Sequence, residues 1–366
     1  MKVCHLTSVH SPHDIRIFIK ECRSLNMEGY DVTYIVPNAT SETKDGVKII
    51  GIPSDATNER SRMIKTTKAV YEAALKVNAD IYHFHDPELI PTGLKLKRKG
   101  KKVIHDIHED VPRQILEKQW IPSPLRKSIS VVFERYENYA AQKFDAVIAA
   151  TPYICERFKK IGANAYNVNN YPILSELYAP DTDWSNKNST VCFIGGITKV
   201  RAAHEMVQAI EKTNAQLIFG GNIAPQQLKV DLQSYKGWSQ VKDLGFVNRE
   251  IVADVMSESL AGLVLYHPLP NHINAQPNKM FEYMSAGIPV IGSAFPLWKE
   301  IIEGNRCGIC VNPLEPNEIA QAIEWMTAHP EEAEVMGKNG RKAIEEQYNW
   351  EKESTTLISI YKSLSK

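Results

Sequence analysis

The chain has 366 residues, more than one hydrophobic core normally organises, so two domains are expected. Lysine plus arginine and aspartate plus glutamate number 43 each, and this balance argues against a dedicated nucleic-acid-binding protein. No apolar run approaches the roughly 18 residues that a membrane-spanning helix needs. Residues 2–9 are typical of a strand rather than of a signal peptide, so we expect a cytoplasmic protein.

The first half of the chain alternates between strand-like and helix-like segments. An apolar strand at 2–7, apolar residues at helical spacing over 15–25 and a second strand at 32–36 predict a βαβ unit and a parallel sheet. The alternation continues with strands at 47–52, 81–84, 102–104 and 146–149, a helix at about 59–77 and a helix that ends at Arg98. The turn at 8–14 has no glycine, so it lacks the G-x-G-x-x-G pattern of a dinucleotide-binding fold.

Histidines and acidic residues follow two of these strands, at 85–88 and at 105–110. Ligands of parallel sheets bind beyond the carboxyl ends of the strands, so we expect both clusters at one edge of the sheet. The clusters could ligate a metal or recognise sugar hydroxyls, and the lack of an i,i+4 histidine pair on a helix favours the second interpretation. His83 and His105 are expected to be structural and to pair with backbone at the strand ends.

The second half restarts the alternation after residues 173–189, which are rich in proline, aspartate and asparagine and predict an interdomain linker. A strand at 191–194 leads into Gly195-Gly196. Glycines permit close approach of the backbone, and Lys199 and Arg201 nearby could neutralise a diphosphate.

Residues 274–291 predict a loop, a short helix and a buried strand. Pro277 suits the first helical turn, and Gly287 suits the helix end. The helix N-terminus together with Lys279 would attract a phosphate, and Glu282, about one turn further on, would accept hydrogen bonds from ribose hydroxyls. The alternative is a capped helix whose Glu282 faces water.

The segment Phe281-Glu282-Tyr283-Met284 followed by Gly287-Ile288-Pro289-Val290-Ile291 resembles the donor-nucleotide motif of group 1 (GT4-type) glycosyltransferases. Those enzymes retain the anomeric configuration and have the GT-B fold, an α/β fold of two Rossmann-like domains with parallel sheets flanked by helices and a ligand cleft between the domains. The family's motif has two glutamates eight positions apart. Here Glu282 matches the second and Asn274 replaces the first, a change that bears on the donor sugar.

The patterns and the resemblance together imply the site residues. Catalytic roles fall to His108, Asp14, Arg201 and Lys279. The donor nucleotide is expected against Glu282, Gly196, Lys199, Gly221, Val247, Asn248, Asn278, Met280 and Phe281. The donor sugar or the acceptor is expected near His10, Arg16, His85, Asp86, Glu109, Asn274 and Pro277. For Asp14, a simple helix cap is an equally good interpretation.

The resemblance also implies the domains and the activity. Residues 1–172 would form the acceptor-side domain, residues 190–349 the nucleotide-sugar domain, and a last helix at about 350–366 would pack back on the first domain. The expected activity is transfer of a hexosyl or N-acetylhexosaminyl group from a nucleotide-diphosphate sugar to a glycan or lipid-linked acceptor in cell-surface polysaccharide synthesis. UDP is the expected nucleotide, since it is the commonest in the family. No metal and no cofactor are expected. The alternatives are a non-hydrolysing UDP-sugar 2-epimerase and a non-catalytic, two-lobed sugar-binding protein.

Two basic segments, at 94–102 and 119–127, could dock on an anionic membrane, since each cation near such a surface contributes about 1 kcal/mol. The second segment also contains apolar residues that look exposed. We therefore expect peripheral contact with the inner face of the plasma membrane, which would suit a lipid-linked acceptor.

Overall fold

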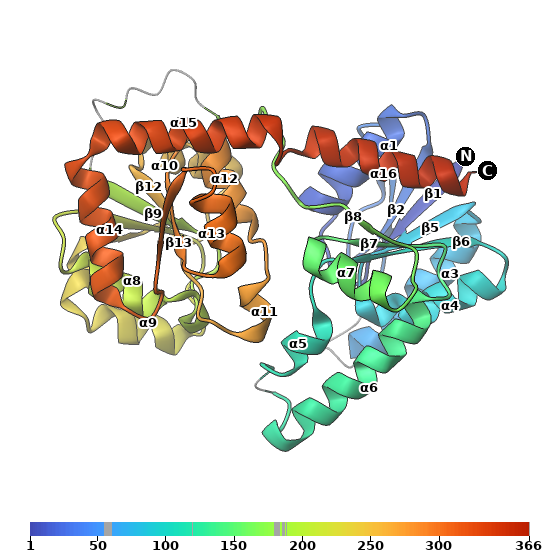
Figure 1. Cartoon of the computed structure of the whole chain (residues 1–366). Helices are drawn as coiled ribbons and strands as arrows, with labels where there is room; N and C mark the ends of the chain where they lie inside the picture. The colour runs from blue at the N-terminus through green and yellow to red at the C-terminus, as the bar shows by residue number, and fades with distance from the viewer. Residues whose placement is uncertain (55–60, 119, 179–183, 185–186, 188, 366) are drawn as a thin grey trace. The chain divides into compact units, whose positions relative to one another are not determined.

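A computed structural model describes residues 1–54, 61–118, 120–178, 184, 187 and 189–365. The chain divides into two compact units (Figure 1): unit 1 comprises Met1–Asn170 with Glu351–Lys366, and unit 2 comprises Tyr171–Trp350. Each unit is a largely parallel β-sheet with helices on both faces. The expected class, α/β with two Rossmann-like domains, is confirmed.

The sheet of unit 1 has β1 at its centre. Among the described residues its strand order is β3 (Glu42–Lys44), β4 (Val47–Ile52), β2 (Asp31–Pro37), β1 (Lys2–Leu6), β5 (Ile81–Phe84), β6 (Lys102–Ile107), β7 (Ala146–Ala149) and β8 (Ala165–Asn167). Neighbouring strands pair in parallel except for β3 and β4, which form an antiparallel hairpin absent from the sequence prediction. Its turn residues Asp45 and Gly46 both have positive φ, as a two-residue hairpin turn requires.

Strand β6 is longer than predicted, so His105 and Asp106 belong to the strand rather than to the loop after it. The reason is its position between β5 and β7, which pair with it on both sides, with Phe84 opposite His105 and Ala149 opposite Ile107. Both polar side chains are therefore buried inside unit 1.

The helix predicted at 15–25 begins with a π-helical segment, η1 (Ile15–Cys22), and continues as α1 (Arg23–Met27). The Asp14 carboxylate accepts a hydrogen bond from Ile17 N and caps its start. The remaining helices of unit 1 are η2 (Arg62–Thr66), α3 (Thr67–Val77), η3 (Pro87–Leu89), α4 (Ile90–Arg98), α5 (Val111–Ile115), α6 (Ser123–Ala141), α7 (Pro152–Lys160) and α16 (Trp350–Leu364).

Helix α16 carries the end of the chain onto unit 1 (Figure 1). Tyr361 is fully buried, and its hydroxyl lies 2.8 Å from His83 Nδ1 on β5. Glu353 accepts a hydrogen bond from Asn169 N at 2.8 Å. These contacts anchor α16 by buried polar groups as well as by its apolar face.

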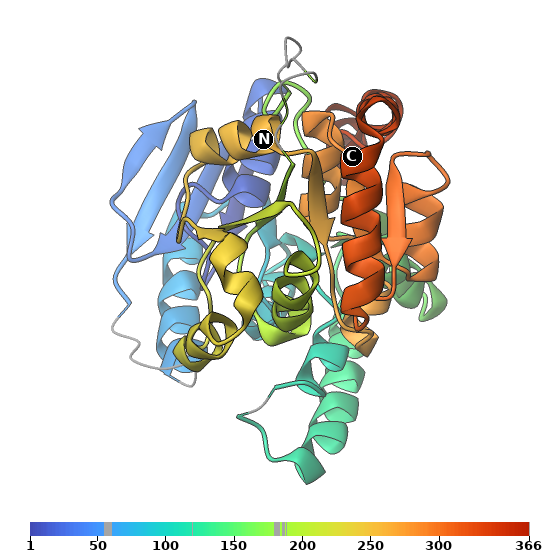
Figure 2. The ribbon, with the colours of Figure 1, turned by 90° about the vertical axis from the view of Figure 1, so that its left-hand side faces the viewer.

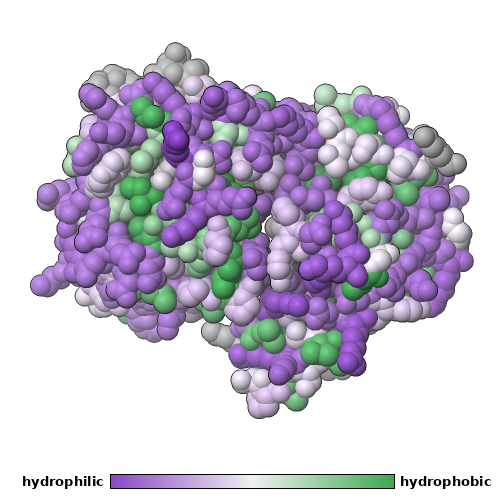
Figure 3. Space-filling view, viewed as in Figure 1, coloured by the Kyte–Doolittle hydropathy of each residue, from purple (hydrophilic) through white to green (hydrophobic). Residues whose placement is uncertain are grey.

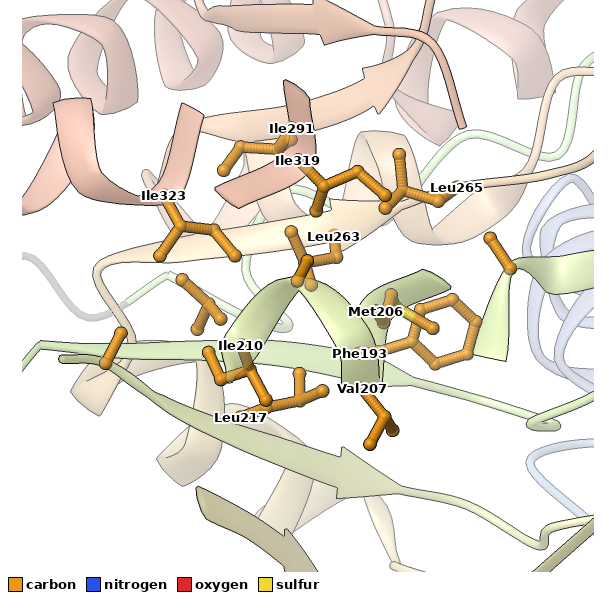
Figure 4. Packing of buried hydrophobic residues seen from close by; sticks show 14 of the residues in the cluster. Phe193, Met206, Val207, Ile210, Leu217, Leu263, Leu265, Ile291, Ile319 and Ile323 are labelled. Carbon is orange, nitrogen blue, oxygen red and sulfur yellow. The ribbon is translucent and has the colours of Figure 1, made fainter. Parts of the chain in front are cut away.

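The sheet of unit 2 is parallel throughout the described residues. Its order is β11 (Val241–Asp243), β10 (Gln216–Gly220), β9 (Thr190–Ile194), β12 (Ala261–Val264), β13 (Val290–Ser293) and β14 (Gly308–Val311). Figure 4 shows the core on one face of this sheet, where Phe193, Leu217 and Leu263 pack under residues of α8 and α14. Strands covered on both faces are almost wholly apolar, which explains why these segments were recognisable in the sequence.

The helices of unit 2 are η5 (Lys199–Arg201), α8 (Ala203–Ile210), α9 (Gln226–Gln233), η6 (Lys236–Gln240), α10 (Arg249–Glu258), α11 (Pro270–Ile273), α12 (Asn278–Ala286), α13 (Pro296–Ile302), α14 (Pro316–Ala328) and α15 (Pro330–Glu346). Helix α12 ends at Gly287, which has a left-handed conformation with φ 75°, as predicted. Pro277 is the N-cap of α12 rather than its first helical residue.

Parts of three predicted segments lie outside the described residues: the linker at 173–189, the start of the helix at 59–77, and Gln119 in the basic segment at 119–127. Within the described residues, no helix combines the length and the apolar character that crossing a bilayer demands.

Candidate functional site

Two groups of polar residues stand out, and each belongs to one unit. In unit 1 they follow or end the adjacent strands β1, β5 and β6. In unit 2 some of the polar residues follow β9 and β10, and others lie at the start of α12. Loops at the carboxyl ends of parallel strands are where such sheets bind ligands.

Asp106 is the hub of the unit 1 group. Its carboxylate accepts hydrogen bonds from Arg16 Nε and Nη2 at 2.9 and 2.8 Å. His85 Nδ1 lies 3.1 Å and His108 Nε2 3.0 Å from Asp106 Oδ2. Burial raises the pKa of this carboxyl, but the charge of Arg16 and the two histidines outweigh burial and hold the pKa well below its ordinary value.

The loop after β1 is tied to the same group through Asp86. This carboxylate accepts a hydrogen bond from the Thr7 hydroxyl at 2.7 Å and one from Ser8 N at 2.6 Å. The loop thereby places His10, whose Nδ1 lies 3.0 Å from Asp14 Oδ2. Burial opposes both charges, yet this hydrogen bond raises the pKa of His10 and lowers the pKa of Asp14 to about 2.

His10 and His108 are the histidines of this group that reach the surface. Their side chains are 27 % and 20 % exposed, and their ring centroids lie 5.4 Å apart. By contrast, Arg16, His85 and Asp86 are almost fully buried and hydrogen-bonded to protein partners. The arrangement favours a positioning role for these three and direct contact with a ligand for His10 and His108.

The other residues predicted in unit 1 lie in different environments. Glu109 is exposed next to His108. His83 and His105 were expected to pair with backbone groups. This expectation is wrong for His83, because its Nδ1 forms a hydrogen bond with the Tyr361 hydroxyl. His105 instead stacks on Phe84, with ring centroids 4.3 Å apart, and burial lowers its pKa to about 3.

The unit 2 group is built on two glycine turns in close contact. Gly195 has φ 114°, a conformation that favours glycine, and its N donates to Gly220 O at 2.8 Å. A Cβ on Gly221 would lie 2.1 Å from Gly195 O, and a Cβ on Gly195 would lie 2.9 Å from Lys279 Nζ. The turns therefore need glycine because of backbone approach and because a lysine occupies the space above.

Lys279 is the most unusual residue of the protein. It is only 8 % exposed, and its Nζ lies over the rings of Phe193 and Tyr266, 4.3 and 5.7 Å from their centroids. In the described part of the chain, no hydrogen-bond acceptor or ion-pair partner is found for this ammonium. Burial, with a contribution from the charge of Arg201, lowers the pKa of Lys279 to about 7.

Arg201 shares this environment. Its Nη1 donates to Gly196 O at 2.8 Å, and its guanidinium lies 5.4 Å from the centroid of Tyr266. Lys199, two residues earlier in the same short helix η5, is exposed. Two cations beside glycine turns and the N-terminus of α12 form a site for a strongly charged anion such as a diphosphate.

Glu282 does not face water freely. Its carboxylate accepts a hydrogen bond from Arg249 Nη1 at 2.7 Å, and its side chain is 18 % exposed. Arg249 Nε also donates to Glu176 at 2.7 Å, so this arginine joins two carboxylates. Sequence reasoning missed Arg249, although it directly follows Val247 and Asn248, two of the predicted nucleotide residues.

The other nucleotide residues predicted in unit 2 occupy varied environments. Met280 and Phe281 have side chains in the hydrophobic core, so only their backbone could reach a ligand. The Asn248 side chain caps α10 by accepting from Ile251 N. Val247 is half-buried, whereas Asn278 at the start of α12 is exposed, and Asn274 is the C-cap of α11.

The fold and the two groups define a two-domain α/β protein in which two cations lie beside glycine turns of the second domain. Two family models match the chain: "Glycosyltransferase Family 4" over residues 17–168 and "Glycosyl transferases group 1" over residues 176–343. The chain belongs to the group 1 (GT4-type) glycosyltransferases.

Curated relatives agree with this family. An uncharacterized glycosyltransferase of Methanocaldococcus jannaschii is 26% identical over 177 residues, which are 47% of this chain and 44% of that protein. The D-rhamnosyltransferase WbpZ of Pseudomonas aeruginosa is 26% identical over 151 residues, 40% of this chain and 38% of that protein. The matched part therefore spans less than half the length of these relatives.

Solved structures resemble the whole chain in fold. Sucrose-phosphate synthase from Thermosynechococcus elongatus has a TM-score of 0.82 at 18% identity, covering 99% of this chain and 98% of that one. HepE from Anabaena, solved with UDP and glucose, has a TM-score of 0.75 at 14% identity, covering 99% and 100%. The structure of trehalose-6-phosphate from E. coli bound with UDP-2-fluoro glucose has a TM-score of 0.72 at 11% identity, covering 98% of both chains.

Proposed function

We propose that this glycosyltransferase moves a sugar, with retention of configuration, from a UDP-sugar to a glycan or lipid-linked acceptor. The observation that carries the proposal is Lys279, a buried ammonium beside glycine turns, a second cation and the N-terminus of α12. A buried charge without a partner is costly, so the site gains most when an anion neutralises it. The nucleotide complexes of the HepE and E. coli structures support a nucleotide sugar as the donor.

The diphosphate would lie against Lys279 and Arg201. As the bond to the sugar breaks, the leaving diphosphate gains negative charge, and cations already fixed in a water-poor site stabilise that charge. Glu282, held by Arg249, would accept hydrogen bonds from the ribose hydroxyls. The nearby Gly245–Asn248 loop would face the base. With two cations and a helix N-terminus present, we propose that this step needs no divalent cation.

Unit 1 would supply the groups that meet the sugar or the acceptor. His10 and His108 are the partly exposed ends of a hydrogen-bonded network fixed by Asp14, Asp86 and Asp106. A histidine held by a carboxylate has a defined tautomer and orientation, which suits it to bind a sugar hydroxyl. Arg16, His85 and Asp86 would act through these residues.

The test is turnover of nucleotide sugars by the purified full-length chain. We expect release of UDP from at least one UDP-sugar, faster with acceptor and unchanged by EDTA. A 2-epimerase would convert the UDP-sugar to its epimer without acceptor, and a sugar-binding protein would release no UDP from any donor. Either of those two results, obtained over a panel of UDP- and GDP-sugars, would overturn the proposal.

We also propose that unit 1 docks on an anionic membrane through α6, which begins within the predicted segment 119–127, more than through the segment 94–102. Leu125, Ile129, Val132, Tyr136 and Tyr139 recur at three- and four-residue spacing, and each is at least 37 % exposed. Figures 1 and 2 show the N-terminal part of α6 projecting from unit 1, and Figure 3 shows apolar side chains gathered there among hydrophilic ones.

Charge favours a membrane over a second copy of the chain as the occupant. Lys127 and Arg135 flank the stripe and are exposed, whereas Glu134 is held by Arg113 at 2.6 Å and Glu137 is buried. Two such faces would repel each other, but an anionic surface would attract both the cations and the apolar stripe. In the segment 94–102, by contrast, Lys97 is already neutralised by Asp145 at 2.8 Å.

Vesicle flotation tests this contact. We expect the chain to bind vesicles with anionic lipid at low salt, and Val132→Glu to abolish the binding. Val230→Glu, at a residue 54 % exposed on α9, is the matched control and should bind normally. No flotation of the wild type, or equal flotation of Val132→Glu, would show that α6 is not a membrane contact.

A further inference from the structure

A second cluster of ionisable side chains lies entirely inside unit 1 and shares only His85 with the function proposed above. It consists of His5 on β1, His83 and His85 at the end of β5, and Glu21 on η1. Neighbouring strands place His5 directly opposite His83. His85, two residues further on, points to the same face because side chains alternate along a strand. The η1 helix covers that face and brings Glu21 onto the three imidazoles.

The donor atoms of these four residues converge on one point. His5 Nδ1 and His85 Nε2 are 3.0 Å apart. Glu21 Oε2 is 3.8 Å from each of them and 4.0 Å from His83 Nδ1. A tetrahedral zinc ion with bonds of about 2.0–2.1 Å needs ligand atoms roughly 3.3 Å apart. The four donor atoms all lie within 4.8 Å of one another, so shifts of up to about 1.5 Å would complete the shell.

Glu21 is unusual because its ionisable side chain is buried without a hydrogen-bond partner among the described residues. Its side chain is 0 % exposed, and within the described residues neither of its carboxylate oxygens has a hydrogen-bond partner. Arg16 Nε lies 3.2 Å from Oε1, but Arg16 is already bound in bidentate fashion to Asp106. A carboxylate aimed at three imidazoles in a dry interior is the arrangement that a bound cation stabilises.

The local backbone also points to a built site. Glu21 faces inward from a π-helical segment, a rare conformation that appears mostly where a functional side chain must be placed. A regular α-helix would place residues 20–22 differently around the axis. Arg16 and Lys20 of the same segment are buried as well.

The outer partners suit metal-bound imidazoles. His85 Nδ1 lies 3.1 Å from Asp106 Oδ2, so Nε2 would be free to ligate while Nδ1–H donates to a carboxylate. His5 Nε2 lies 3.3 Å from the Tyr361 hydroxyl, which leaves Nδ1 for the metal. The Tyr361 hydroxyl now bonds His83 Nδ1 at 2.8 Å, and ligation of that nitrogen would transfer the hydroxyl wholly to His5.

We propose that His5, Glu21, His83 and His85 bind one zinc ion as a structural site. Three imidazoles and one carboxylate form a ligand set suited to zinc, and full burial leaves no open position for a substrate. The overlapping group His85, Asp106 and His108 is a weaker candidate, since Arg16 already occupies Asp106. The ion would join β1, β5 and η1 and would fix His85, the neighbour of Asp106.

The experiment measures the metal content of the full-length chain after purification, brief EDTA treatment and gel filtration. We expect about one zinc per chain by mass spectrometry. Absorption spectroscopy at the zinc edge should show nitrogen and oxygen ligands at about 2.0–2.1 Å. Removing the ion with a strong chelator in mild urea should lower the melting temperature, and added Zn²⁺ should restore it.

Glu21→Gln is the informative variant because it keeps the shape of the side chain and removes its charge. We expect it to hold less than a tenth as much zinc as the wild type and to have a melting temperature that Zn²⁺ does not change. Glu109→Gln, on the exposed loop after β6, is the matched control and should retain the metal. A wild-type protein that elutes without stoichiometric metal and whose melting temperature does not respond to Zn²⁺, Mn²⁺ or Fe²⁺ would overturn the proposal, whatever the variants do.

Discussion

The two units share one architecture but treat charge in opposite ways. In unit 1 the charged groups neutralise one another inside the fold: Arg16 is paired with Asp106, and Asp14 with His10. In unit 2 the ammonium of Lys279 is buried over two aromatic rings, and within the described residues it has no ion-pair partner. Unit 1 therefore uses charge for its own structure and for positioning, whereas unit 2 holds an unneutralised cation ready for a ligand.

The largest effect should come from breaking the internal neutralisation of unit 1. Asp106→Asn leaves the buried guanidinium of Arg16 without its carboxylate, and we expect the free energy of unfolding to fall by about 3–5 kcal/mol. Urea denaturation followed by circular dichroism measures this change, with Glu109→Gln as the exposed control. Exposed ion pairs contribute less than about 1 kcal/mol to the free energy of unfolding. A decrease of that size in Asp106→Asn would show that Asp106 is not the hub of the unit 1 group.

The corresponding change in unit 2 should act in the opposite direction on stability. Lys279→Met removes a buried, unpaired charge, so we expect the ligand-free protein to gain roughly 0.5–2 kcal/mol. The same variant should lose about 10²–10³-fold in kcat, since it removes a cation that stabilises the leaving diphosphate. Lys212→Met, at an exposed position after α8, is the control for both measurements.

A Lys279→Met protein that is strongly destabilised would place this residue with the structural pairs of unit 1. Full activity of the variant would exclude Lys279 from the reaction.

The pH dependence of stability and of UDP binding should also distinguish the unpaired Lys279 of unit 2 from the paired charges of unit 1. The pKa of Lys279 is lowered to about 7 in the fold, from 10.5. Between these values the unfolded chain binds more protons, so this group makes the ligand-free protein more stable as pH rises from about 7 to about 10.5. A bound diphosphate favours the ammonium, so UDP binding at a pH near 8.5 should take up about one proton.

Calorimetry in buffers of different ionisation enthalpy measures that proton. At this pH a terminal phosphate, with a pKa of about 6, is already fully ionised and contributes little. Lys279→Met should bind without proton uptake. Equal uptake by wild type and variant would assign the proton to another group.

The smallest effect is expected at the rim of the nucleotide site. Arg249 orients Glu282, but its side chain is 35 % exposed, so solvent weakens the ion pair. We expect Arg249→Met to reduce UDP affinity by about 1.4- to 5-fold, equivalent to roughly 0.2–1 kcal/mol. Fluorescence or calorimetric titration with UDP measures the change, with Lys242→Met as the exposed control. A loss of a hundredfold or more would give Arg249 a direct contact with the nucleotide.

The fold and the unit 2 site were predictable because their signals are local in sequence. Apolar runs mark the strands, and Gly195, Gly196 and Arg201 lie within seven residues of one another. The placement of Lys279 at the start of α12 follows from Pro277 and Gly287 at the two ends of the helix. What could not be predicted is that Lys279 is buried, because burial depends on β9 and β12 lying beneath α12.

The polar network of unit 1 depends on sheet order, which the sequence does not specify. His5 and His85 are 80 residues apart in the chain and meet because β5 pairs with β1. Asp106 was assigned to a loop because its polarity hides the end of β6. Glu21 was overlooked because a single charged residue is not part of the apolar pattern, and the π-helical segment has no clear mark in the sequence.

The central claim is that unit 2 grips a nucleoside diphosphate through Lys279, Arg201 and Glu282, and titration of the full-length chain with UDP tests it most directly. The account predicts that UDP binds the wild type and raises its melting temperature. Glu282→Ala should bind at least about a hundredfold more weakly, because two hydrogen bonds from ribose hydroxyls to a carboxylate are lost. Glu258→Ala, exposed at the end of α10, should bind like the wild type. Failure of UDP to bind the wild type, or undiminished affinity in Glu282→Ala, would contradict the account.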